Sequence, residues 1–194
     1  MFLKELKASI LILAVFTVLT GLAYPCAIAG LARLCFPRQA EGSLIVVQGR
    51  AVGSALIGQP FDDPKYFWGR PSATTPPYNA SSSAGSNLGP INPDLMKAVK
   101  ARIEALRAAD PENEGPIPVD LVTSSASGLD PHVSLAAAYY QAPRVAGARR
   151  LSESDVLRAI KRHTRGRLLG IWGEPVVNVL ELNLDLDGIG KNGE

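Results

Sequence analysis

The most strongly patterned part of the chain is an apolar stretch near its N-terminus. From Ala8 to Ala32 no residue carries a charge, and Leu, Ile, Val, Ala and Phe predominate. A helix of this length reaches roughly 37 Å, which is enough to cross a hydrocarbon core of about 30 Å. A core helix of a soluble domain keeps a polar face, and this stretch has none. The pattern therefore predicts a transmembrane helix over residues 8–32.

A cleaved signal peptide is the alternative interpretation of this stretch. Lys4 and Lys7 supply a basic start, and Ala27-Ile28-Ala29 resembles a cleavage site. The apolar stretch is longer than a signal peptide requires and continues past that site. Its length favours an uncleaved anchor.

The flanking charges do not decide the orientation of the span. Two basic residues lie before it, and Arg33 and Arg38 follow it, so the two sides are equal. A short N-terminal tail normally stays in the cytoplasm while a long C-terminal part is exported. We therefore expect residues 1–7 in the cytoplasm, residues 8–32 in the plasma (inner) membrane in contact with lipid, and residues 33–194 as an extracytoplasmic domain.

Small residues recur in the second half of the span, at Gly21, Ala23, Ala27 and Gly30. Ala23 and Ala27 lie four residues apart and so share a helix face. Faces of this kind let membrane helices approach closely, which predicts a packing face for a partner helix. The alternative is that small residues are simply common in spans. Pro25 is expected to kink the helix unless a neighbour satisfies the carbonyl group that it leaves free.

Beyond the span, strand-like and helix-like patterns alternate, which favours one α+β domain. The clearest helix has Asn92 as its cap and Pro93 at its first position, and it ends at Asp110-Pro111. The other expected elements are a hairpin of strands 43–47 and 51–57, a strand over 119–122, a helix from Leu135 to Gln141 that stops near Pro143, a helix from Ser152 with a C-cap at Gly166, and a strand over 180–186, where Leu alternates with polar residues.

A long segment from Gly69 to Ile91 is rich in Gly, Pro, Ser, Thr and Asn. A structureless loop of this length is uncommon in a compact domain. The segment is therefore expected to be either disordered or held against another surface. The aromatic run Tyr66-Phe67-Trp68 just before it is expected to pack in the core.

Composition narrows the possible functions only modestly. The chain has 20 basic and 18 acidic residues, so its net charge is +2. A charge near zero argues against a nucleic-acid-binding protein. Two cysteines cannot build a disulfide framework. Basic residues are concentrated over residues 144–167, which favours a solvated surface; a docking surface for an acidic partner or lipid headgroups is the alternative.

The sequence motifs of common catalytic sites are missing. There is no phosphate-binding P-loop and no G-x-S-x-G motif, and neither His132 nor His163 has ligands at metal-binding spacing. A serine hydrolase would need a general base beside its nucleophile, so folding would have to bring His132 close to Ser124, Ser125 or Ser127. A membrane-anchored exported serine hydrolase is therefore a disfavoured alternative, and an envelope binding module is another. We predict no catalytic and no metal site.

An ordered set of short motifs follows the span and covers nearly the whole chain. The motifs are Gly42-Ser43-Leu44, Gly53-Ser54-Ala55-Leu56-Ile57-Gly58-Gln59, Tyr66-Phe67-Trp68-Gly69-Arg70-Pro71-Ser72, Gly85-Ser86-Asn87-Leu88, Leu121-Val122-Thr123-Ser124-Ser125-Ala126-Ser127-Gly128-Leu129-Asp130, Gln141 with Arg144-Val145-Ala146, and Pro175-Val176-Val177-Asn178-Val179. Taken together they resemble the C subunit of the Kdp potassium-transporting P-type ATPase.

The resemblance implies an accessory, non-catalytic subunit with three partners: a channel-like potassium-translocating subunit, an ATP-hydrolysing P-type subunit and a small single-span subunit. It also implies that the chain stabilises the complex and raises the ATP affinity of the ATP-hydrolysing subunit. ATP is then a possible shared ligand, and Gln141 and Arg144 are the candidate contacts, because an amide and a guanidinium can hold a base edge and a phosphate. Since ATP is cytoplasmic and the domain is expected outside, linkage through a partner is the compatible mechanism.

The Ser/Gly/Pro-rich loop is the candidate docking surface for these partners. Its candidate contact residues are Arg70, Pro71, Ser72, Gly85, Ser86 and Asn87.

Overall fold

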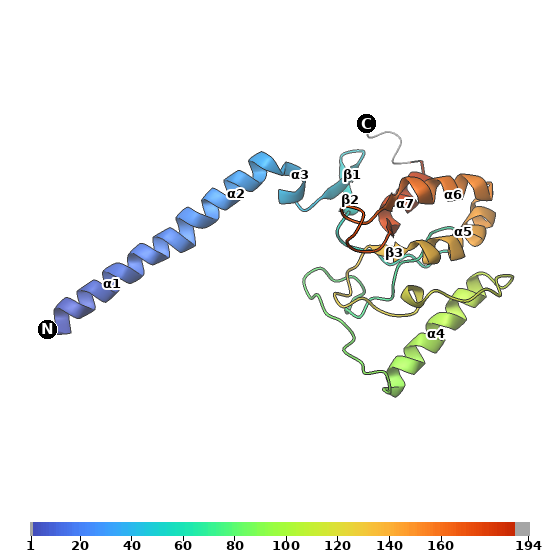
Figure 1. Cartoon of the computed structure of the whole chain (residues 1–194), viewed down its shortest axis with the longest axis horizontal. Helices are drawn as coiled ribbons and strands as arrows, with labels where there is room; N and C mark the ends of the chain where they lie inside the picture. The colour runs from blue at the N-terminus through green and yellow to red at the C-terminus, as the bar shows by residue number, and fades with distance from the viewer. Residues whose placement is uncertain (1, 189–194) are drawn as a thin grey trace. The chain divides into compact units, whose positions relative to one another are not determined.

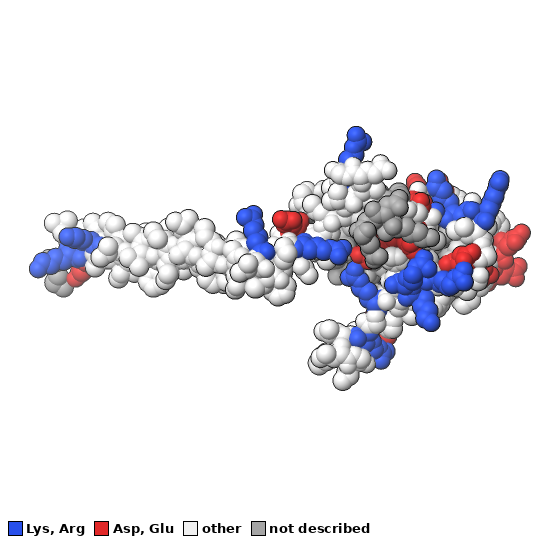
Figure 2. Space-filling model, turned by 90° about the horizontal axis from the view of Figure 1, so that it is seen from above, with Lys and Arg blue, Asp and Glu red and all other residues white. Residues whose placement is uncertain are grey.

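The computed structural model describes residues 2–188, which form two units, residues 2–44 and residues 45–188. The first unit is helical, in blue tones in Figure 1, and comprises α1 (Phe2–Val18), a π-helical turn (Leu19–Ala23), α2 (Tyr24–Cys35) and the short α3 (Pro37–Ala40). The helix over Phe2–Cys35 is long and apolar enough to cross a membrane, and its side chains are exposed. Figure 2 shows charged side chains only near the ends of this helical unit.

The π-helical turn lies directly before the proline of the span. The backbone N–H of Tyr24 donates to the carbonyl of Leu19, five residues back. Pro25 has no N–H to donate, so the regular α-helical pattern is interrupted at this point. The interruption takes the form of this widened turn.

The second unit is an α+β domain, as the sequence predicts. Strands β1 (Leu44–Val47) and β2 (Arg50–Ser54) form a two-stranded sheet. Strands β3 (His132–Ser134), β5 (Val176–Asn178) and β4 (Thr164–Arg165) form a second, antiparallel sheet with β5 in the centre, where Val133 lies opposite Val177. The helices are α4 (Pro93–Ala109), α5 (Leu135–Arg149), α6 (Glu153–Arg162) and α7 (Val179–Leu186), with a 3-10 turn over Val119–Leu121.

The core lies where α5, α6 and α7 meet the central strand β5. It contains Val145 and Ile160 from the helices, Val177 from the strand, and Phe67 and Trp68 from the loop that precedes the long Ser/Gly/Pro-rich segment. Figure 1 shows α4 at one side of this unit. Leu106, near the C-terminal end of α4, reaches the core.

The sequence predicted the starts of three helices correctly from their capping residues. Asn92, Ser134 and Ser152 each occupy an N-cap, where the side chain accepts a hydrogen bond from a backbone N–H in the first turn. Such bonds satisfy donors that the first turn leaves without intrahelical partners.

The expected strand over 180–186 is wrong, because these residues form α7. Asn178 caps this helix by accepting from the N–H of Glu181. Leu180, Leu182 and Asn183 are all buried. Since several sides of so short a helix are covered, its leucines show no clear period of 3.6, and the alternation mimics a strand.

Three further elements differ from the sequence prediction, one in its type and two in where they end. Residues 119–121 form a 3-10 turn rather than a strand, and the N–H of Thr123 bonds back to the carbonyl of Val119. Helix α5 continues through Pro143 to Arg149, since the carbonyl group that Pro143 leaves free belongs to Tyr139, on the exposed side. Helix α6 ends at Arg162 with His163 as its C-cap, before Gly166, because the chain then pairs with β5.

Candidate functional site

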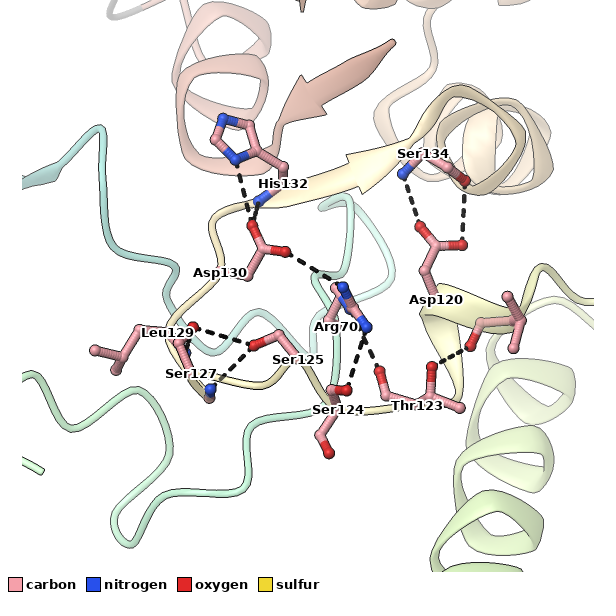
Figure 3. A network of polar contacts seen from close by, with 12 residues as sticks. Arg70, Asp120, Thr123, Ser124, Ser125, Ser127, Leu129, Asp130, His132 and Ser134 are labelled. Carbon is pink, nitrogen blue, oxygen red and sulfur yellow. Dashed lines mark hydrogen bonds and ion pairs between the residues drawn. The ribbon is translucent and has the colours of Figure 1, made fainter. Parts of the chain in front are cut away.

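The long Ser/Gly/Pro-rich segment is held against residues 123–130 by a network of hydrogen bonds, which we call the loop network (Figure 3). Arg70 donates to the carbonyl of Ser124 at 3.2 Å and to the carboxylate of Asp130 at 3.3 Å. Ser72 donates to the carbonyl of Gly128 at 2.7 Å and accepts from the N–H of Tyr78 at 2.9 Å. Of the two outcomes that the sequence left open, the structure shows the second: the segment is held in place.

The two segments also approach too closely for ordinary side chains. A Cβ added to Gly85 would lie 2.8 Å from the carbonyl oxygen of Ala126. Gly128 has a φ of +66°, and a Cβ there would lie 2.6 Å from the carbonyl oxygen of Ala84. Glycine is therefore required at both positions for the segments to touch. Ser86 and Asn87, in contrast, point into solvent, and Pro71 is half-buried.

Asp130 is the electrostatic centre of the loop network. It accepts from Arg70 and from both the backbone N–H and the ring of His132, with its oxygen 3.3 Å from His132 Nδ1. Burial opposes ionisation of this carboxyl, but the hydrogen bonds and charge of His132, together with Arg70, outweigh burial and lower its pKa. Arg70, Asp130 and His132 line an open pocket of about 400 Å³.

Ser125 and Ser127, near His132, bind backbone groups of their own segment. Ser125 and Ser127 lie 3.3 Å apart, and their hydroxyls accept from the N–H groups of Gly128 and Leu129. His132 is bound instead to Asp130. Neither the hydroxyl of Ser125 nor that of Ser127 bonds to His132, and within residues 2–188 no group of three or more His, Cys, Asp or Glu residues is placed to hold a metal ion.

A second network lies inside the domain, and we call it the buried network. Gln141 accepts from the N–H of Trp68 and donates to its carbonyl, at 2.8 and 3.2 Å. Asn183 makes the same two contacts with Phe67, at 2.8 and 3.0 Å. The backbone N–H and carbonyl groups of Phe67 and Trp68 are thus paired with two side-chain amides, as a neighbouring strand would pair them in a sheet.

Arg144 completes the buried network. It donates to the carbonyls of Pro64 and Tyr66 and to the side-chain oxygen of Gln141, and its guanidinium lies 4.9 Å from the ring centre of Trp68. Burial lowers the pKa of Arg144 to about 10, which leaves the group charged at neutral pH. The structure thus brings the two candidate nucleotide contacts together, with both side chains already bound to the protein. A nucleotide contact at Gln141 and Arg144 stays a prediction.

The small residues of the candidate span lie on a helix whose apolar stretch is exposed. From Tyr24 to Cys35 the helix is α-helical, so Ala23, Ala27 and Gly30 fall at i, i+4 and i+7 on one face. A Cβ at Gly21 or at Gly30 would meet open space. Gly21 lies inside the π-helical turn.

Two residues of the second unit were not predicted from the sequence: Arg102 positions the loop, and Asn183 holds the aromatic segment before it. Arg102, on α4, donates to the carbonyls of Leu121 and Gly69 and lies 5.0 Å from the ring centre of Trp68. It therefore joins α4 to the start of each of the two segments that the loop network connects. Asn183 was placed on an exposed strand face. The signal for Arg102 is its position within the apolar stripe of α4, where a charged residue needs a partner.

These features define a class of protein: an α+β domain that follows one helix long and apolar enough to cross a membrane, with a preformed polar loop surface among the described residues. The family model for KdpC, "K+-transporting ATPase, c chain", matches residues 6–188. The chain belongs to this family.

Similar proteins carry the same description over nearly their full length. A potassium-transporting ATPase KdpC subunit from Sorangium cellulosum is 63% identical over 187 residues, covering 96% of this chain and 98% of that protein. Proteins with this name from Dechloromonas aromatica (59% identical, covering 96% of this chain and 98% of the relative) and Methylibium petroleiphilum (62%, covering 94% and 96%) are equally similar.

Proposed function

We propose that this chain is a non-catalytic accessory subunit that stabilises an ATP-driven potassium-uptake complex and raises the ATP affinity of its ATP-hydrolysing subunit. The observation that carries the proposal is the family match over residues 6–188, with relatives about 60% identical over nearly their whole length. In this proposal its partners are the channel-like, the ATP-hydrolysing and the small single-span subunits.

The soluble unit lies outside the cell in this proposal, and the N-terminal tail lies in the cytoplasm. ATP affinity is then changed at a distance. If the loop network docks on the partners in one state of the transport cycle, that state is favoured, and a state with higher ATP affinity gains population by linkage. A tenfold change in ATP affinity requires a coupling free energy of about 1.4 kcal/mol. A preformed surface suits this role, because little ordering is needed on docking.

The test is a comparison of the transport complex with and without this chain. The four subunits are co-expressed and purified in mild detergent, and the KM for ATP of the potassium-stimulated ATPase is measured for each preparation. We expect a lower KM and better recovery of the intact complex when the chain is present. Equal recovery and equal KM values would overturn the proposal.

The span is tested separately through its small face. Replacing Ala23 and Ala27 together by Leu should prevent close approach of a partner helix and reduce co-purification. Leu11→Ala with Leu13→Ala, at exposed sites in α1, is the matched control and should leave co-purification intact. Undiminished co-purification of the Ala23/Ala27 variant would exclude this face from assembly.

Orientation is tested by labelling. Glu114 lies exposed in the second unit and outside the candidate docking loop, so Glu114→Cys in a Cys26→Ala, Cys35→Ala background gives one accessible thiol. A membrane-impermeant maleimide should label it in intact spheroplasts if the domain is extracytoplasmic. Labelling only after lysis would reverse the topology.

A further inference from the structure

The hairpin that joins β4 to β5 ends in an exposed apolar tip. The tip consists of Leu168, Leu169, Ile171 and Trp172, with exposed fractions between 69% for Trp172 and 83% for Leu169. Large apolar side chains that gather in this way on a soluble surface mark an interaction site. In the sequence this run gives no signal of a helix or a strand, because its apolar residues flank Gly170 and follow neither spacing.

The tip has a defined shape. The N–H of Leu168 donates to the carbonyl of Trp172 at 2.8 Å, and the N–H of Trp172 donates back at 3.0 Å. The N–H of Ile171 closes a turn onto the carbonyl of Leu168 at 3.1 Å. Leu169 and Gly170, the central residues of this turn, have φ values of +52° and +74°. Two positive values correspond to the tight hairpin turn that normally carries Asn-Gly.

Leu169 is therefore an unfavourable residue for folding at its position. A leucine rarely adopts a positive φ, whereas asparagine does so readily. Packing within this domain does not offset that cost, because the side chain of Leu169 is 83% exposed. A residue that lowers local stability and stays exposed among the residues that the structure describes points to a contact with another molecule.

The charges around the tip indicate which kind of molecule this is. Arg167 pairs with Glu174 at 2.8 Å, and Arg165 pairs with Glu181 at 3.0 Å. The arginines that would attract anionic lipid headgroups are thus neutralised by adjacent carboxylates. An apolar centre with a tryptophan, surrounded by polar groups of both signs, is instead the arrangement of a protein–protein interface.

We propose that this hairpin tip docks into an apolar groove, rimmed by charged groups of both signs, on another membrane subunit of the transporter. The docking site rests on the proposed function, since it requires that the chain belongs to a multi-subunit complex. The chain would then contact its partners at two places: through the span in the bilayer and through the hairpin tip outside it.

A photo-crosslinking experiment identifies what the tip touches. The photoreactive residue benzoylphenylalanine is placed at Trp172, and as a control at Met96, which is 51% exposed on α4. The full chain is co-expressed with the other subunits, irradiated in native membranes, and the adducts are identified by mass spectrometry. We expect a subunit adduct from position 172 that is much stronger than from position 96. Adducts to phospholipid alone, equal subunit yields from the two positions, or no adduct at position 172 would overturn the docking site.

A turn-compatible substitution separates docking from folding. Leu169→Asn suits the backbone of the turn, so the thermal midpoint of the purified full chain should be equal to or above that of the wild type. The rate at which the complex loses the chain in detergent should nevertheless rise about tenfold, as expected on removing a central apolar contact. Met96→Gln is the matched control and should leave this rate unchanged.

The outcomes distinguish the two proposals. If the wild-type chain retains no other subunit on purification, the proposed function itself fails. If the wild type is retained and Leu169→Asn dissociates at the same rate, the complex stands and only the docking site is wrong.

Discussion

The buried network and the loop network both pair backbone groups that lie outside helices and sheets, one in the core and the other near the surface. In each, side chains from one segment satisfy the backbone of another that is far away in the sequence. Gln141 is 1% exposed and Arg144 is 8% exposed, whereas Arg70 and Asp130 are half-buried. Water can therefore replace a lost partner in the loop network but not in the buried one.

This difference assigns different roles to the two networks. The buried network fixes Phe67 and Trp68 in the core, so it supports the fold itself. The loop network holds a surface segment whose exposed residues stay available to a partner. We therefore expect changes in the buried network to unfold the domain, and changes in the loop network to alter the surface while the core persists.

The largest expected effect is from Gln141→Leu. This change keeps the volume of the side chain but leaves the N–H of Trp68 buried without an acceptor, and Arg144 also loses an acceptor. We expect a loss of about 3 kcal/mol in the free energy of unfolding, measured by denaturant titration of the full chain in detergent. Glu104→Leu, at an exposed site on α4, is the control and should have little effect.

The same variant tests the nucleotide contact that the sequence suggested. If Gln141→Leu has wild-type stability but raises the KM for ATP of the complex, Gln141 acts on ATP affinity, by contact or by linkage through a partner, and its structural role is minor. Loss of stability, together with an unchanged KM in the folded fraction, would remove Gln141 from the nucleotide site.

A smaller effect is expected from Ser72→Ala, in the loop network. The N–H of Tyr78 and the carbonyl of Gly128 both lose a partner, but water can reach this half-buried region. We expect a loss of about 1–2 kcal/mol and faster hydrogen exchange at the Tyr78 amide. Ser86→Ala, at an exposed position of the same loop, should change stability by less than about 0.5 kcal/mol. Equal effects from the two variants would mean that the loop network does not hold the segment.

A pH-dependent effect comes from Asp130. Its pKa is lowered in the folded state, so its contribution to stability is complete above the unfolded value near 3.8 and is lost as the pH falls through the folded pKa. Asp130→Asn should therefore be less stable than the wild type at pH 7, by about 1 kcal/mol or less for a half-exposed pair, and the difference should shrink below about pH 4. Thermal unfolding from pH 3 to pH 7 measures this. A difference independent of pH would mean that the charge of Asp130 is not what stabilises the loop.

The elements that the sequence predicted correctly are those determined by residues close together in the chain. Helix α4 was predicted because its signals, Asn92 and Pro93, lie within a few residues of each other. The span was predicted because length and hydropathy suffice. The π-helical turn at residues 19–23 had only Pro25 as a sign of irregularity.

The two networks were not predicted, because their partners are far apart in the chain. Nothing local to Gln141 indicates that it binds Trp68, and nothing local to Arg70 indicates that it binds Ser124. The family motifs contain Arg70, Ser72 and Gly85, which take part in the loop network, yet the contacts of these residues follow only from the folded chain. For α7 the failure had another cause, since burial on several sides removed the periodic pattern.

The smallest expected effect on stability is at Asn87, and it separates the loop as a scaffold from the loop as a docking surface. Asn87 is exposed and has a φ of +51°, which glycine adopts without strain. Asn87→Gly should therefore change the free energy of unfolding by less than about 0.5 kcal/mol, as measured by thermal unfolding. If the loop docks on a partner, the same variant should still dissociate faster from the complex, because the amide that would contact the partner is gone. Wild-type dissociation would place Asn87 outside the docking surface and would leave the loop network as a purely internal support.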